Sequence, residues 1–219
     1  MTRTVAFALA LLIGLAAATP AAAGEGPASQ PVLAPQSLTT EALLDTLQHT
    51  AFNFFWNEVN ASNGLIRDRN TTWSPCSIAS LGFGMSAICV GIDHGWITRT
   101  QGRDRILTAL QTLWTKPQGT AVSGMIGYKG LYYHFLDMNT GTRTWTCELS
   151  TIDTALLFAG IIDAKQYFST SDPMDALVRQ YADSITYRAD WDFMRNSNPG
   201  ILMGWKPETL FNGFGQWIG

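Results

Sequence analysis

The stretch IASLGFGMSAICVGI, residues 78–92, decides the fold class of this chain. Almost every side chain in it is apolar or small, so it predicts a helix over residues 77–93 that is buried on all sides. A second apolar helix is expected over residues 150–168, which contain the run IDTALLFAGIIDA. Glycines in the first of these helices indicate close approach by neighbouring backbones: Gly82, Gly84 and Gly91.

Three further helices are predicted from cap residues and periodicity. They cover residues 40–59, starting at Thr40, residues 98–115, starting at Thr98 or Thr100, and residues 172–187, starting at an Asp-Pro pair. The helices over residues 98–115 and 172–187 each have one apolar and one polar face. The helix over residues 40–59 has apolar residues at core spacing: Leu43, Leu44, Leu47, Ala51, Phe54 and Phe55.

This alternation of apolar and two-faced helices is typical of an inner ring of helices inside an outer ring, as in an α/α toroid. A plain helical bundle is the alternative. A full toroid of six hairpins needs about twelve helices, so the chain is either a different small helical fold or part of a larger domain. A small β-hairpin is expected between residues 117 and 147. The predicted fold class is therefore all-α with a β-hairpin excursion.

The N-terminus reads as a targeting segment. Residues 1–23 combine a short basic start, an apolar run and small residues, which predicts a signal peptide; a membrane anchor is the alternative. Residues 24–38 are rich in Pro, Ala, Ser and Gly and predict a flexible leader. The folded domain is then expected over residues 39–219, in an exported protein, periplasmic or extracellular, without a stable membrane span.

Charge and cysteine content exclude several classes of function. The formal net charge is −3 and no run of Lys or Arg occurs, so nucleic acid is not an expected partner. No zinc spacing, phosphate loop, dinucleotide fingerprint or nucleophile elbow is present, so neither a metal nor a cofactor is expected. Cys89 suits a small core residue, a Cys76–Cys147 disulfide stays open, and the oligomeric state is not indicated.

Four acids near loop–helix junctions are the candidate catalytic residues: Glu148, Glu208, Asp153 and Asp137. Glycoside hydrolysis needs two carboxyl groups with different pKa values. A loop glutamate beside aromatic side chains suits the acid, because burial favours the neutral form. Each acid also has a structural alternative: a turn contact for Asp137, a local cap for Glu148, the helix dipole for Asp153 and solvation for Glu208.

Loop aromatics and arginines near these acids suit a carbohydrate cleft, because flat rings stack on the apolar faces of sugars and guanidinium groups bond hydroxyls. The alternatives are packing between helix layers for the aromatics, a structural role for the histidine, and loop tethering for the Arg-Asp-Arg triplet. The predicted substrate-binding residues are Arg67, Asp68, Arg69, Tyr133, His134, Trp145 and Trp205.

Several blocks of the chain together resemble the bacterial glucoamylase-like domain family, which includes exported β-1,2-glucan hydrolases. The resemblance runs from about Thr50 to Gly219. The blocks are FNFFWNEVNASNGLIRDRN, SIASLGFGMSAICVGIDHGWITR, YYHFLDMNTGTRTWTCELSTIDTALLFAGIIDAKQYF, YRADWDFM, GWKPE and FGQWIG.

The resemblance implies an (α/α)6 toroid with a sugar-binding cleft at one end, and hydrolysis of an oligo- or polysaccharide glucan by carboxylates without a cofactor. It points to Glu148 and Glu208 as the strongest catalytic candidates, with Asp137 and Asp153 supporting them or replacing them. Members of the family continue past the block where this chain stops, so a C-terminally truncated, incomplete toroid is expected. The alternatives to an active hydrolase are an inactive carbohydrate-binding fragment and a structural fragment.

Overall fold

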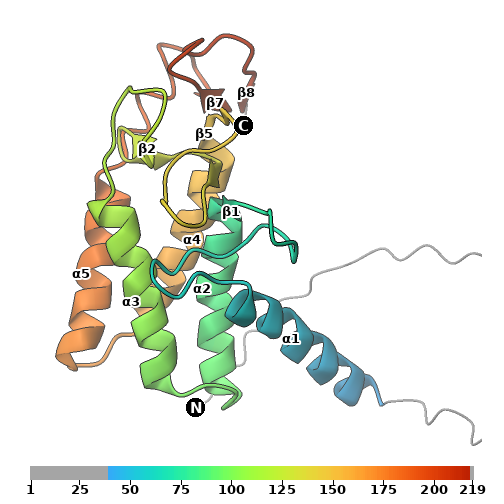
Figure 1. The fold of residues 1–219 in the computed structure, drawn as a ribbon. Coiled ribbons are helices and arrows are strands. Elements are labelled where there is room, and N and C mark those ends of the chain that lie inside the picture. Colours follow the sequence, from blue (N-terminus) through green and yellow to red (C-terminus); the bar gives the residue numbers. More distant parts are fainter. Residues whose placement is uncertain (1–38, 218–219) are drawn as a thin grey trace, which may run out of the picture. The chain divides into compact units, whose positions relative to one another are not determined.

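The computed structural model describes residues 39–217, so the predicted signal peptide and leader lie outside the described residues. Five helices are present in this range, as the sequence predicts (Figure 1): α1 Thr40–Asn57, α2 Ile78–Asp93, α3 Arg99–Thr115, α4 Thr151–Tyr167 and α5 Pro173–Tyr187. None of the described helices is long and apolar enough to cross a membrane.

The helix starts follow from local capping. Thr39, one residue before the predicted cap, accepts a hydrogen bond from the Ala42 amide at 3.2 Å. Thr98 begins α3 with a reciprocal capping box. Ser150 caps α4, and Asp172 caps α5 ahead of a proline in its first turn. Short polar side chains therefore set where each of these helices begins.

The centre of the fold is the contact between α2 and α4, which pack against each other while α3 packs against α5. A Cβ atom added to Gly160 would lie 2.0 Å from the carbonyl oxygen of Gly82, and one added to Gly82 would lie 2.4 Å from the carbonyl oxygen of Leu156. Glycine is therefore needed at both positions for the two helices to approach this closely. The two predicted apolar helices are therefore present and in direct contact with each other.

The prediction that the helix over residues 77–93 is buried on all sides is wrong, and the second apolar helix is not fully buried either. Phe83 and Val90 on α2 are exposed, and so are Ile152 and Ile162 on α4. These side chains lie on faces that the other described elements leave uncovered. Each helix is buried where it meets its neighbours and solvent-facing elsewhere.

The predicted core face of the first helix is also wrong in its N-terminal half. Leu43, Leu44 and Leu47 are exposed, whereas Phe52 is 4% exposed and packs against Gly91 of α2. Figure 1 shows why: α1 meets α2 near its C-terminal end and slants away from it toward its N-terminus. Nearer the N-terminus, the described contacts of α1 are made by polar side chains: Asp45 lies 3.9 Å from His94, and His49 stacks on Trp96.

Eight two-residue strands form four antiparallel pairs among the described loops: β1 Cys76–Ser77 with β4 Phe135–Leu136, β2 Gly127–Tyr128 with β3 Leu131–Tyr132, β5 Leu149–Ser150 with β7 Gly204–Trp205, and β6 Ile201–Leu202 with β8 Gln216–Trp217. The β2–β3 pair is a hairpin within the predicted range of residues 117–147, with its turn at Lys129 and Gly130, while the Asn139–Gly141 turn is closed by an isolated bridge between Leu136 and Arg143. In Figure 1 the short strands gather at the end of the helices where α2 and α4 begin. Loops far apart in sequence are thereby joined at one end of the helical layer.

The three cysteines are free and buried, so the Cys76–Cys147 disulfide left open by the sequence is not formed in this structure. Cys89 lies in the core, as predicted. Burial raises the pKa of the Cys76 thiol to about 12, which keeps it protonated and unreactive at neutral pH.

Candidate functional site

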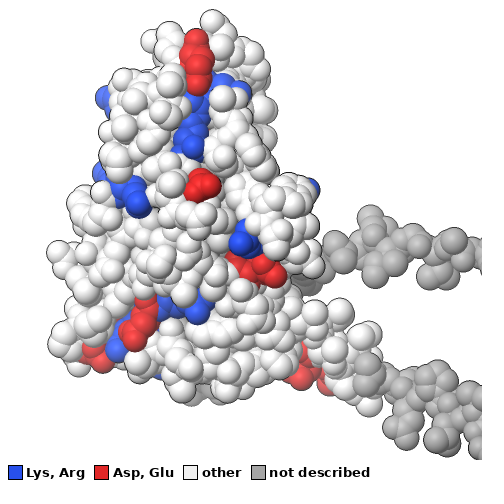
Figure 2. Space-filling model, viewed as in Figure 1, with Lys and Arg blue, Asp and Glu red and all other residues white. Residues whose placement is uncertain are grey.

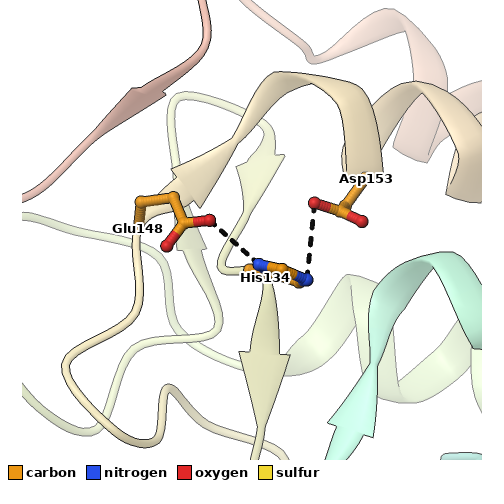
Figure 3. Close-up of side chains that lie close together, drawn as sticks. All are labelled: His134, Glu148 and Asp153. Carbon is orange, nitrogen blue, oxygen red and sulfur yellow. Dashed lines mark hydrogen bonds and ion pairs between the residues drawn. The ribbon is translucent and has the colours of Figure 1, made fainter. Parts of the chain in front are cut away.

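Three of the predicted residues, His134, Glu148 and Asp153, meet at the end of the helices that carries the strands (Figure 3). His134 lies between β3 and β4, and its amide donates a hydrogen bond of 2.9 Å to the carbonyl oxygen of Glu148. Glu148 immediately precedes β5, and Asp153 lies in the first turn of α4. The backbone therefore brings the three side chains together from segments up to 19 residues apart.

His134 lies between the two carboxylates. Its Nδ1 atom is 2.9 Å from Oε1 of Glu148, and its Nε2 atom is 3.6 Å from Oδ2 of Asp153. Partial burial of the imidazole acts to lower its pKa, but the hydrogen bond to Glu148 and the charges of Asp153 and Glu148 outweigh it, so the pKa of His134 is raised. The cluster favours an imidazolium held by two acids.

The same contact shifts the pKa of Glu148 in the opposite direction to that of His134. The hydrogen bond from His134 lowers the pKa of the Glu148 carboxyl, against the raising effect of its burial. A general acid would need a raised pKa, so the lowered pKa of Glu148 suits the ionised member of a catalytic pair.

Ser150 holds Asp153, the second acid of the cluster. The Ser150 hydroxyl donates a hydrogen bond to Oδ2 of Asp153 at 2.5 Å.

Each of the three residues offers a ligand atom within 4.8 Å of the other two, a spacing compatible with a cation. In this geometry each carboxylate faces a different nitrogen of the ring, so the contacts within the cluster are two ion pairs through His134 (Figure 3).

Glu208 is held by Arg143, which is not among the predicted site residues. The Arg143 guanidinium donates to both carboxylate oxygens of Glu208, at 2.7 and 3.1 Å. It also donates from Nε to the carbonyl oxygen of Cys147 at 2.7 Å. The hydrogen bonds from Arg143 lower the pKa of Glu208. The only sequence signal for this pair is an arginine that lies five residues before Glu148.

Pairing of β5 with β7 brings the segments of Glu148 and Glu208 alongside each other. Leu149 pairs with Trp205 in this register. The positive charge of Lys206 helps to lower the pKa of both glutamates, which places it within electrostatic range of each. The two strongest catalytic candidates from the sequence therefore flank one short strand pair.

Asp137 bonds the backbone of its own turn, which is the structural alternative to a catalytic role. Its Oδ1 atom accepts hydrogen bonds from the amides of Asn139 and Thr140, at 2.9 and 2.8 Å. These bonds, with the Thr140 amide first, lower the pKa of Asp137. The carboxylate closes the turn between β4 and the segment that contains Arg143.

The Arg-Asp-Arg triplet divides into a tether and an exposed pair. Arg67 donates to the carbonyl oxygens of Thr72 and Ser74, at 2.8 and 3.0 Å, and so ties down its own loop. Arg69 and Asp68 form an ion pair at 3.1 Å with the arginine 61% exposed. The charge of Asp68 contributes to the raised pKa of His134, so this loop lies close to the cluster.

The predicted sugar-stacking residues lie in three environments. Trp145 is 57% exposed. Tyr133 is fully buried, with the Arg143 guanidinium carbon 4.7 Å from its ring centroid, and burial raises its pKa to about 12. Trp205 is 3% exposed and forms a wall of a cavity of about 450 Å³ with Tyr128 and Phe193. Of these three, Trp145 has the ring face most open to solvent.

Charged side chains occur in small mixed groups on the face shown in Figure 2, with wide uncharged areas between them. This agrees with a chain in which 14% of residues are charged. A neutral polymer would meet little electrostatic opposition on such a surface.

No family model matches the chain. Among curated proteins, it is 27% identical over 185 residues to an exo β-1,2-glucooligosaccharide sophorohydrolase (non-reducing end) of Parabacteroides distasonis, a match that covers 80% of this chain and 24% of that protein.

Two solved structures are also similar. A candidate glucoamylase from Bacteroides uniformis has a TM-score of 0.72 and 26% identity, over 81% of this chain and 42% of that chain. A β-1,2-glucanase from Parabacteroides distasonis has a TM-score of 0.70 and 26% identity, over 80% of this chain and 25% of that chain. These matches confirm the predicted resemblance to glucoamylase-like proteins related to β-1,2-glucanases. The chain spans less than half the length of each of these relatives.

Proposed function

We propose that this chain carries part of the catalytic site of a glycoside hydrolase that acts on glucan, with β-1,2-glucan as the substrate. The observation that carries the proposal is the 2.9 Å contact between His134 and Glu148 beside an exposed tryptophan. The names of the relatives support the same class of activity. The five helices would then form part of an (α/α)6 toroid in an exported enzyme.

Glu148 is the ionised carboxylate in this mechanism. Its lowered pKa keeps it ready to accept a proton from water or to attack the sugar. Asp153 faces the opposite nitrogen of His134, so its role is to hold the imidazole in place. The His134 ring fills the space between these two carboxylates, which leaves no room there for a glycosidic bond.

The second carboxyl group of the pair is Glu208, carried alongside by β7. Arg143 orients it through two hydrogen bonds and favours its ionised form. For Glu208 to donate a proton, the bound saccharide would have to weaken that ion pair. The Glu208 side chain is 36% exposed. A sugar that displaces water from it would raise its pKa and so favour the protonated form.

Reducing-sugar release from linear β-1,2-glucan tests the proposal. We expect Glu148→Gln to abolish release while circular dichroism shows the helical content of the unaltered protein. Glu41→Gln, the same change at an exposed position on α1, serves as the matched control and should leave the rate unchanged. Full activity of folded Glu148→Gln would remove this residue from the mechanism.

A protein that binds saccharide without hydrolysing it is the second candidate, favoured by the lowered pKa values of Glu148 and Glu208, which leave neither carboxyl poised to donate a proton. Calorimetry with linear β-1,2-glucooligosaccharides separates the two functions. Binding without any release of reducing sugar from folded, unaltered protein would favour this second function over hydrolysis.

A further inference from the structure

Two exposed tryptophans from different loops lie side by side next to the acidic cluster. Trp73 belongs to the loop before β1 and is 64% exposed, while Trp145 precedes β5 and is 57% exposed. Their ring centroids are 6.5 Å apart. Two large apolar rings that the fold holds together in water, 72 residues apart in sequence, are costly unless a ligand covers them.

A continuous row of rings joins this pair to the cluster. The centroid of Trp145 lies 5.4 Å from that of Phe135, which in turn stacks on the His134 ring at 3.8 Å. His134 contacts Glu148. A ligand lying on the tryptophans would therefore extend directly toward the carboxylate that the proposed function uses.

The backbone beneath Trp145 is strained. Trp145 and Thr146 both have left-handed φ angles, of +54° and +51°. This region is unfavourable for bulky or β-branched residues by about 1 kcal/mol or more each. Such strain is typical of functional segments, and here the strained segment carries a tryptophan that is 57% exposed.

A charged pair lies beside one of the two rings. The Arg69 guanidinium carbon lies over the Trp73 ring, 5.9 Å from its centroid, and Arg69 is also paired with Asp68 at 3.1 Å. Apolar ring faces edged by hydrogen-bonding groups match a pyranose, which has C–H bonds on its faces and hydroxyls at its rim. The planes of the two tryptophans are inclined at 43°, so one flat sugar cannot lie on both rings.

We propose that Trp73 and Trp145 form a stacking platform for two sugar units of a linear glucan, each ring taking one unit and Arg69 bonding hydroxyls at the edge. The platform rests on the proposed function for its choice of glucan. Its role is to hold the chain that leads to Glu148.

Calorimetric binding of linear β-1,2-glucooligosaccharides to the full chain tests the platform. We expect Trp73→Ala and Trp145→Ala each to weaken binding about threefold to tenfold, the loss of one good stacking contact. Trp73→Phe retains a ring and should lose less than Trp73→Ala. Tyr187→Ala, at an 82% exposed aromatic residue on α5, is the control and should bind as the unaltered protein does.

Thermal melting separates lost binding from lost folding. Trp145→Gly relieves the left-handed strain, so it should melt at no lower temperature while binding more weakly. Unchanged affinity in Trp73→Ala and Trp145→Ala would overturn the platform, as would a failure of the unaltered chain to bind. If either result is obtained while the unaltered chain still releases reducing sugar, the platform is wrong but the proposed function stands. Weaker binding by the tryptophan variants of a chain that does not hydrolyse glucan would support the platform and remove the proposed function.

Discussion

The Nδ1 atom of His134 lies 2.9 Å from Oε1 of Glu148, a contact between residues 14 positions apart. It couples two titrations: the imidazole gains affinity for its proton and the carboxyl loses affinity for its own. Most of the chemistry proposed for this site depends on that coupling. The first two predictions test it directly.

Proton NMR should show that His134 titrates above pH 6.5, the ordinary value for an imidazole. We expect Glu148→Gln to lower this pKa, because it removes both the hydrogen bond and a negative charge beside the ring. His134→Gln assigns the signal by deleting it. A His134 pKa that is the same with and without the Glu148 carboxylate would contradict the contact.

Stability should depend on pH through the same pair. The raised pKa of His134 adds stability that is complete below pH 6.5 and is lost as the pH rises through the raised value. The lowered pKa of Glu148 adds stability that is complete above pH 4.5 and is lost as the pH falls through the lowered value. Both contributions are present between these limits.

The melting temperature of His134→Gln should therefore fall furthest below that of the unaltered protein between pH 4.5 and 6.5. Glu148→Gln should show the same profile, since either change removes the pair. The double variant should add little to the single ones. A pH-independent difference in melting temperature would show that the pair does not titrate as described.

Arg143 and Glu208 should contribute unequally to stability. Arg143 is 2% exposed in its side chain and also bonds the carbonyl oxygens of Cys147 and Val122. Arg143→Met should lower the free energy of unfolding by about 2–4 kcal/mol, because it leaves these groups without donors.

Glu208→Gln is the companion change at the other end of the same ion pair. Glu208 is 36% exposed, so solvent screens its charge, and the loss should be about 1 kcal/mol or less. Urea unfolding followed by circular dichroism measures both variants. Equal losses would mean that the ion pair, rather than the backbone contacts of Arg143, stabilises this region.

The contact between α2 and α4 should not tolerate a methyl group. A Cβ on Gly160 would lie 2.0 Å from the Gly82 carbonyl oxygen, so Gly160→Ala must separate the helices and should cost about 2 kcal/mol or more. Gly102→Ala is the matched control on α3, where the nearest atom is the movable end of the Ile92 side chain, at 2.6 Å. A similar loss of unfolding free energy in both variants would contradict the backbone contact.

Much of the helical architecture was predictable because it is local. Ser150 and the Asp172–Pro173 pair mark helix starts within one turn of the residues they cap, so α4 and α5 follow from short stretches. Exposure was less predictable. Leu43 and Phe83 have core-like spacing or composition, yet each is exposed because burial requires a neighbour, and neighbours are set by packing rather than by local pattern.

The candidate site also has a part that was predictable from the sequence and a part that was not. Composition and position pointed to Glu148, Asp153 and His134, and the structure brings these three together. Tyr133 has the same kind of loop setting as Trp145, but it lies fully buried under Arg143. No local signal distinguishes the two, because the direction of a loop side chain depends on the segments that pack around it.

By itself the sequence determined the helices, the hairpin and the resemblance to glucoamylase-like proteins, all of which depend on residues close together in the chain or on blocks in a given order. Only the tertiary structure decided that His134 separates Glu148 from Asp153, that Arg143 holds Glu208, and that Trp73 lies beside Trp145. Protonation and stacking depend on distances of a few ångströms between segments 14 to 72 residues apart. The folded chain alone sets such distances, since no local preference specifies them.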